Sequence, residues 1–269
     1  MKLRKMTSAG MMDCKNALTE ANGDFDRAVE IIREKGKLVA AKRADRETTE
    51  GAVLIRVNGG KAVLVCLGCE TDFVSATPDF KALAEEIADA AIANFPADLE
   101  ALKACKCSNG HTVEEEISAQ TGKTGEKHLL AYYSTLEAPF IAQYVHNNSK
   151  VASIVAFNKE VPEEIGKNVA QQVTAMNPIS VSKDDCPKDA VEKEMAMLKQ
   201  QMLEDPKMAG KPEAMLDNIA KGKLQKFFKE QTIEEQEFIW DAKVSVAEYI
   251  HAADKDAKVM DFRRFSLND

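Results

Sequence analysis

The stretch GAVLIRVNGGKAVLVCLGC, residues 51–69, carries the strongest fold signal in this chain. Its two runs of valine, isoleucine and leucine flank an Asn-Gly-Gly turn at 58–60, where asparagine and glycine supply the positive φ of a tight hairpin. We therefore expect antiparallel strands over 51–57 and 61–69. Thr77-Pro78 follows, and proline at the first helical position, with apolar residues at helical spacing after it, predicts a helix there.

The same order of elements occurs again later in the chain. Two apolar runs, 140–146 and 151–157, flank a polar turn at 147–150, and Pro162 precedes another helical pattern. This recurrence predicts two related hairpin-plus-helix subdomains, a first at 51–138 and a second that begins at 139–186. Between the two patterns, we expect residues 95–138 to be helical or loop-like.

Two further helical regions flank or interrupt this α+β core. Apolar residues at helical spacing on both sides of Gly210-Lys211-Pro212 predict an antiparallel, coiled-coil-like helical hairpin over 187–229, which projects as an arm. Because the pattern then returns to mixed structure, we expect 230–269 to complete the second subdomain, with a final strand near 259–265.

The N-terminal residues 1–36 predict three short helices, and a bundle of this size resembles ubiquitin-associated modules. Ser8 opens the turn between the first two helices, Asp24 is placed to cap the third helix, and Gly36 is expected to end it. The charged residues 37–50 are then expected to form a linker.

The composition limits the classes of partner. The chain has 269 residues, a net charge of −8 and a pI of about 5.3, whereas proteins that bind nucleic acids usually carry a basic balance or stripe. Its only basic stretch, Lys35–Arg46, contains no aromatic residue on which a base could stack. The apolar runs are too short to span a bilayer, and no signal peptide opens the chain. We expect a cytoplasmic protein with a protein partner, without nucleic-acid or membrane binding.

The sequence matches the known motifs of enzymes, cofactor-binding sites and metal sites poorly. Cys66 and Cys69 have the spacing of a redox pair or metal knuckle, but they lie in a strand-like run where their side chains would not converge. The glycines near Lys123 suggest a phosphate loop, yet Ile117 stands where that motif needs glycine. We therefore predict no cofactor, no metal and no enzymatic activity. A thiol or metal enzyme that uses the two cysteines is kept only as an alternative.

Three segments together resemble the elongation factor Ts family. They are AGMMDCK at 9–15, where Ser8 replaces the first glycine of the family pattern, CETDFV at 69–74, and GKP at 210–212. The resemblance covers nearly the whole chain. It implies a guanine-nucleotide exchange factor that releases GDP from the GTPase elongation factor Tu during translation elongation. We expect the extra C-terminal helix of some relatives to be missing after Phe265.

The resemblance also implies a role for Asp72 and Phe73. In the family, this acid and this phenylalanine push between helices of the GTPase, beside its magnesium and phosphate site, and Val74 belongs to the same motif. On this reading, Asp72→Ala and Phe73→Ala slow GDP release and leave the fold intact. The residues alone permit a different interpretation, in which Phe73 folds back onto the core and Asp72 caps a helix.

Four more residues are candidate partner contacts. Met11 and Met12 are adjacent and cannot share one helical face, so if Met11 joins the core Met12 points away from it. The family docks this segment on the nucleotide-binding domain of its partner. His146 ends a strand, and the matching family position touches the region beside the wedge, although a structural histidine is an equal alternative.

Ile239 and Trp240 match a stretch that packs on the partner's outer β-domain in the family, but Trp240 could equally belong to the core. Some relatives use the helical arm for a homodimer, a 2:2 complex or extra partner contacts.

The main alternative to nucleotide exchange is a helical adaptor that binds a protein through residues 1–36 and leaves nucleotide binding unaffected.

Overall fold

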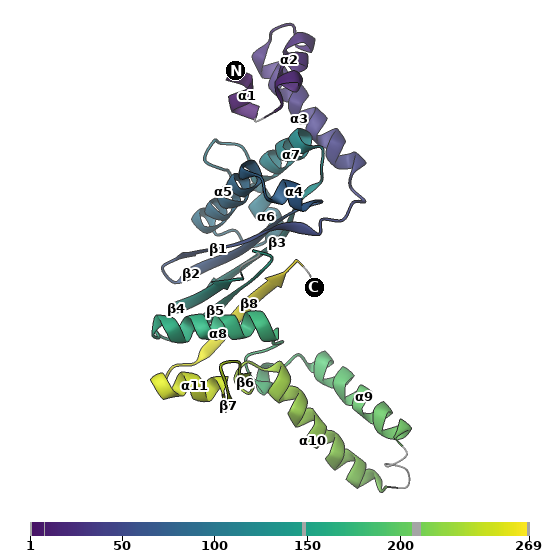
Figure 1. Ribbon diagram of the computed structural model, residues 1–269, viewed down its shortest axis with the longest axis vertical. Coiled ribbons are helices and arrows are strands. Elements are labelled where there is room, and N and C mark those ends of the chain that lie inside the picture. The colour runs from purple at the N-terminus through teal and green to yellow at the C-terminus, as the bar shows by residue number, and fades with distance from the viewer. Residues whose placement is uncertain (1, 8, 147–148, 206–210, 268–269) are drawn as a thin grey trace. The chain divides into compact units, whose positions relative to one another are not determined.

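The computed structural model describes residues 2–7, 9–146, 149–205 and 211–267. It has the mixed helix-and-strand fold that the sequence predicts, with helices at the N-terminus and small sheets after them (Figure 1). Three expected turn features, namely Ser8, residues 147–148 and Gly210, lie outside the described residues. Among the described residues, none of the helices is long and apolar enough to cross a membrane.

The chain divides into two compact units. The first contains Met1–Glu137, Val145–Ala152 and Phe265–Asp269, and the second contains Ala138–Tyr144 and Ser153–Arg264. The finer subdomain boundaries expected from the sequence stay predictions.

The N-terminal module consists of α1 (Lys2–Thr7), α2 (Met11–Glu20) and α3 (Phe25–Lys42). Asp24 caps α3 as expected, because its side chain accepts a hydrogen bond from the Arg27 backbone N–H at 3.0 Å. Small and aliphatic side chains from all three helices form the buried centre of the module: Leu3, Cys14, Ala17, Ala28 and Ile32.

The expectation that Gly36 ends the third helix is wrong. α3 continues through Gly36 to Lys42, so the first part of the expected linker is helical. Gly36 instead lies where α3 crosses α7 (Val113–Thr124): a Cβ at this position would lie 2.6 Å from the Ser118 carbonyl oxygen. Glycine is therefore needed here because two helix backbones approach closely.

The first sheet has the order β1-β2-β3 and is antiparallel. Its first two strands, β1 (Glu50–Asn58) and β2 (Lys61–Cys69), form the hairpin that the Asn-Gly-Gly turn predicts. The third strand, β3 (His128–Glu137), lies in a region expected to be helical or loop-like, and that expectation is wrong for this segment. The strand lacks apolar and polar alternation, and half of its side chains are half-buried.

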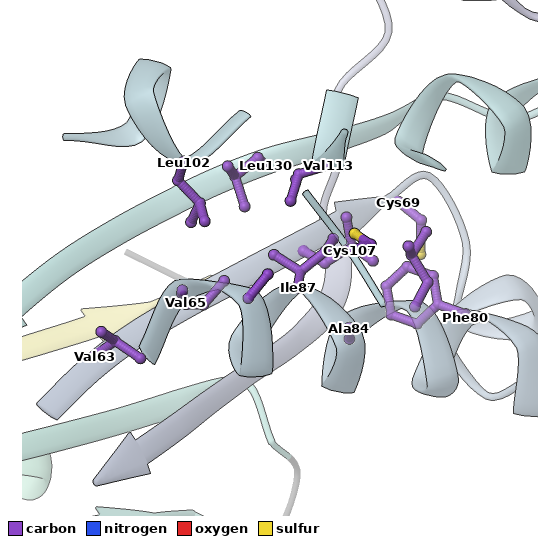
Figure 2. Close-up of a cluster of buried hydrophobic side chains, with 14 residues drawn as sticks. Val63, Val65, Cys69, Phe80, Ala84, Ile87, Leu102, Cys107, Val113 and Leu130 are labelled. Carbon is purple, nitrogen blue, oxygen red and sulfur yellow. The ribbon is translucent and has the colours of Figure 1, made fainter. Parts of the chain in front are cut away.

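Helices cover one face of this sheet and enclose a core with it. α5 (Pro78–Asn94), which begins at the expected proline, packs on β1 and β2, whereas α6 (Leu99–Ala104) and α7 pack on β3. Figure 2 shows how side chains from these elements meet, with Ile87 of α5 near Val65 of β2 and Phe80 of α5 near Cys69 at the end of β2. The cluster includes Val63, Val65, Phe80, Ile87, Leu102, Val113 and Leu130.

The second unit contains most of a sheet with the order β4-β5-β8. Its strands are β4 (Phe140–Val145), β5 (Val151–Phe157) and β8 (Val259–Ser266), and the last of these is the predicted final strand. α8 (Glu163–Met176) follows β5, in the order that the sequence predicts. The core of this unit combines side chains of the sheet, α8 and α11 (Val246–Ala253): Val155, Phe157, Val169, Val173, Ile250 and Val259.

The predicted helical hairpin is formed by α9 (Lys188–Glu204) and α10 (Glu213–Gln231), which pack against each other. Leu198 and Met202 of α9 are buried, as are Ala220 and Phe228 of α10. The chain then continues through β6 (Glu237–Phe238) and β7 (Asp241–Ser245) to α11.

Candidate protein-binding site

A single helical turn, α4 (Asp72–Ser75), connects β2 to α5. Asp72 is its first residue and not its cap, which corrects the expectation that Asp72 caps a helix. The cap is Thr71, whose Oγ1 accepts a hydrogen bond from the Val74 N–H at 3.4 Å. At the other end, Thr77 Oγ1 donates to the Val74 carbonyl oxygen at 2.8 Å and also caps α5.

Phe73 points away from the core of its own unit. Its exposed fraction is 83%, whereas Val74 beside it packs against the cluster beneath α5. The interpretation in which Phe73 folds back onto the core is therefore wrong. A phenylalanine this exposed leaves a large apolar surface in water, as expected of a side chain available for contact with another molecule.

The base of α4 is fixed by a carboxylate that precedes it. Both oxygens of Glu70 accept from Arg43 Nη1, at 2.9 and 2.8 Å, and Glu70 Oε1 also accepts from the Lys127 backbone N–H at 2.6 Å. Lys127 Nζ donates to the carbonyl oxygens of Ala44 and Arg46 at 2.7 and 2.9 Å. The segment after α3 is thus held against the start of the α4 region and is not a free linker.

This arrangement predicts a pH dependence. Burial alone would raise the pKa of Glu70, but the Lys127 N–H and the Arg43 guanidinium outweigh it and lower the pKa from the usual 4.5. The stabilisation is therefore present above pH 4.5 and is lost as the pH falls below it through the lowered folded-state pKa. Because Arg43 is partly exposed, we expect Glu70→Gln to cost about 1 kcal/mol at pH 7.

Denaturant unfolding at pH 7 and pH 3 checks this expectation. The stability difference between wild type and Glu70→Gln should shrink at the lower pH, because below pH 4.5 the Glu70 carboxylate of the unfolded chain takes up a proton more readily than that of the folded chain. Glu137→Gln is the matched control, because Glu137 forms an exposed ion pair with Lys61. An equal stability difference between wild type and Glu70→Gln at both pH values would contradict the stabilising role of the ionised Glu70 carboxylate.

Met11 and Met12 both lie on the surface of the N-terminal module. Their exposed fractions are 68% and 62%, so the idea that Met11 joins Cys14 in the core is wrong. The module fills its centre from α1 instead, since Leu3 is 2% exposed. Two flexible apolar side chains at the start of α2 therefore face solvent, which suits an adaptable contact surface.

His146 follows β4 and is exposed. Its backbone N–H donates to the Val151 carbonyl oxygen at 2.9 Å, and its carbonyl oxygen accepts from the Ser149 N–H at 2.7 Å. These bonds fix the backbone of His146 at the end of the β4–β5 pair. His146 belongs to the first unit, as do the two methionines and the Asp72–Val74 segment.

Ile239 and Trp240 lie in the second unit, at the turn between β6 and β7. Trp240 is 66% exposed, which excludes the core placement within this chain, and Ile239 is 38% exposed. Their neighbour Phe238 is buried and stacks on Tyr249, with ring centroids 3.9 Å apart. Gln172 Oε1 accepts from the Ile239 N–H at 2.9 Å, so the turn that presents Trp240 is anchored to α8.

The cysteines give no support to the thiol-enzyme alternative. Cys66 and Cys69 are buried, and burial raises the pKa of each thiol to about 12. A thiol with that pKa is protonated at neutral pH and is a poor nucleophile or metal ligand. Within the described part of the chain, no group of three or more His, Cys, Asp or Glu side chains could hold a metal ion.

Sequence reasoning missed the residues that hold the exposed turn in place. Thr71 could have been identified, because threonine followed by a short helical segment is a capping signal. Glu126 accepts a hydrogen bond from Thr71 although the two residues are 55 positions apart in the sequence, and a local sequence pattern cannot predict such a contact.

Comparison with known proteins finds similar proteins over nearly the whole chain. The family model described as Elongation factor TS matches residues 70–269. A protein of Porphyromonas gingivalis named Elongation factor Ts is 43% identical over 267 residues, which cover 99% of this chain and 96% of that protein. Proteins of the same name from Christiangramia forsetii and Bacteroides fragilis are 46% and 43% identical, with the same shares covered.

Proposed function

Because the chain belongs to the elongation factor Ts family, we propose that it is the cytoplasmic guanine-nucleotide exchange factor of elongation factor Tu and promotes GDP release during translation elongation. The observation that carries the mechanism is the exposure of Phe73, 83%, on a turn that is fixed at its base. A rigidly mounted and exposed aromatic ring is suited to enter another protein.

The proposed mechanism is mechanical. A GTPase holds GDP through a magnesium ion and through N–H groups of its phosphate loop, so a small displacement of the helices beside them weakens binding. Phe73 supplies the bulk that separates those helices. Asp72, exposed beside it, supplies an acceptor for the displaced backbone or a cationic side chain, and Val74 secures the turn to the core.

The other exposed candidates are proposed as docking surfaces. Met11 and Met12 would contact the nucleotide-binding domain of the partner, with His146 close to the wedge contact. Ile239 and Trp240 would contact the outer β-domain. The arm formed by α9 and α10 is proposed as the surface for a second copy, in a homodimer or a 2:2 complex.

The free energy for exchange comes from linkage and not from covalent chemistry. A factor that binds the nucleotide-free GTPase more tightly than the GDP form must weaken GDP binding by the same ratio. GTP then rebinds and releases the factor. The proposal therefore assigns no catalytic acid, base, metal or cofactor to this chain.

A nucleotide chase experiment, which measures the rate of GDP release, tests the proposed function. Elongation factor Tu loaded with a fluorescent GDP analogue is mixed with excess unlabelled GDP and increasing amounts of this protein. We expect a dissociation rate that rises with concentration and saturates. A rate that stays at its spontaneous value, with the protein folded by circular dichroism, would overturn the proposal and favour an adaptor that binds through residues 1–36.

Substitutions of the docking residues should change the protein concentration at half-saturation, whereas substitutions of the wedge residues Asp72 and Phe73 should change the saturating rate. Trp240→Ala and Met12→Ala remove contacts made equally before and during release, so we expect half-saturation to need about 3- to 10-fold more protein, with an unchanged saturating rate. Met260→Ala is a matched control, because Met260 is 53% exposed and has no proposed role. A lowered saturating rate in either docking variant would contradict this division of roles.

A further inference from the structure

We propose that Glu126 is a positioning residue for the exchange reaction, which sets the orientation of α4 and thereby of Phe73. The inference rests on the proposed function, because it assigns a residue to the same wedge. Glu126 lies outside every segment that suggested a role from the sequence, between the end of α7 and the start of β3.

The side chain of Glu126 holds the residue that caps α4. Glu126 Oε1 accepts from Thr71 Oγ1 at 2.9 Å, and Glu126 Oε2 accepts from the Thr71 backbone N–H at 3.2 Å. A carboxylate can only accept, and a threonine hydroxyl has a single proton, so that proton points towards Glu126. The lone pairs of the hydroxyl are then directed to the Val74 N–H, which is the capping interaction itself.

The capping bond needs this support because it is long. The Thr71 Oγ1 to Val74 N distance is 3.4 Å, beyond the usual range for a hydrogen bond to an N–H group. α4 has four residues, and a helix of one turn has no stability of its own in water. Phe73 therefore depends for its orientation on the anchor beneath Thr71.

Glu126 is itself fixed from both sides. Its backbone N–H donates to Thr124 Oγ1 at 3.1 Å, and its carbonyl oxygen lies 3.0 Å from His128 Nδ1. Burial lowers the pKa of His128, so this imidazole is neutral at pH 7 and its Nδ1–H can donate to Glu126. The carboxylate is thus mounted on a rigid turn, as a positioning residue must be.

The test is a double-mutant cycle in the GDP chase. We expect Glu126→Ala to lower the saturating rate about fivefold or more and to change half-saturation less than twofold. If Glu126 acts through Phe73, the double variant Glu126→Ala/Phe73→Ala should be no slower than Phe73→Ala alone. A loss that only reflected general destabilisation would instead multiply with that of Phe73→Ala.

Two further variants sharpen the cycle. Thr71→Val, which removes the hydroxyl, should repeat the defect of Glu126→Ala, whereas Thr71→Ser keeps the hydroxyl and should restore a wild-type rate. Glu137→Ala, at the end of β3 that is farther along the strand from Glu126, should release GDP at the wild-type rate. A wild-type saturating rate in Glu126→Ala, or a multiplicative loss in the double variant, would overturn the inference.

Amide hydrogen exchange of the free protein tests the anchor without any partner. In Glu126→Ala, the amides of Val74, Ser75 and Ala76 should exchange about tenfold faster or more, while those of β2 stay protected. Unchanged protection of these three amides would also overturn the inference. If wild type does not accelerate GDP release, the proposed function fails, and this measurement still decides whether Glu126 orders α4.

Discussion

Phe73→Ala is expected to lower the saturating rate of GDP release from elongation factor Tu by about 10- to 100-fold. The ring is 83% exposed in the free protein, so its removal deletes little internal packing and should leave the stability of the chain nearly unchanged. In the complex, the same ring would be buried between helices of the partner, where an aromatic anchor contributes most. The chase with fluorescent GDP measures the rate, and circular dichroism checks the fold.

Leu38→Ala is the control for this variant. Leu38 is also exposed, at 62%, but lies on α3 and has no proposed role. Its truncation removes a similar apolar surface without altering the proposed wedge, so the saturating rate should stay at the wild-type value. Equal loss of rate in both variants would show that exposed apolar surface in general, and not Phe73 in particular, supports exchange.

Gly36→Ala is expected to destabilise the protein by about 1–2 kcal/mol, although alanine is the better helix former. The added Cβ would lie 2.6 Å from the Ser118 carbonyl oxygen, and a backbone atom cannot move aside without shifting α7. Gly122 on α7 is similarly close, because a Cβ there would lie 2.9 Å from the Gly36 Cα. The strain should separate α3 from α7 and raise hydrogen exchange in both helices.

Gly222→Ala provides the matched comparison. Gly222 lies within α10, and a Cβ there has no neighbour within 4 Å. The same substitution should therefore stabilise this helix by about 0.5–1 kcal/mol, through helix propensity alone. Denaturant unfolding measures both variants. If Gly36→Ala stabilised the protein as Gly222→Ala does, this result would contradict the close crossing of α3 and α7.

Local signals in the sequence predicted the elements whose causes are local. The Asn-Gly-Gly turn predicted the β1–β2 hairpin, Thr77 and Pro78 predicted the start of α5, and Asp24 predicted the cap of α3. In each case the residue that sets the element lies within or next to it, so a short window of sequence contains the physical reason.

The errors arose where the cause lies elsewhere in the chain. β3 shows no alternation because side chains on both of its faces have packing partners: Tyr133 donates to the Pro96 carbonyl oxygen at 2.9 Å, while the Tyr132 ring stacks on the Phe265 ring with centroids 4.4 Å apart. Gly36 seemed to end a helix because its true neighbour, Ser118, is distant in sequence. A local pattern cannot distinguish a glycine that ends a helix from one that lets two helices touch.

The candidate site was predicted only in part for the same reason. The resemblance suggested Asp72 and Phe73, but the residues alone also allowed Phe73 to be buried, and the structure was needed to show its exposure. The support from Glu126 and Glu70 depends on contacts with Thr71 and Arg43 that form only in the folded chain.

The decisive measurement is the affinity of this protein for elongation factor Tu in its nucleotide-free and GDP-bound forms, for wild type and for Asp72→Ala/Phe73→Ala. By linkage, the ratio of the two affinities equals the factor by which the protein weakens GDP binding. We predict a ratio of about 100 or more for wild type and a ratio at least about tenfold smaller for the double variant. The same ratio for both proteins would contradict the wedge mechanism.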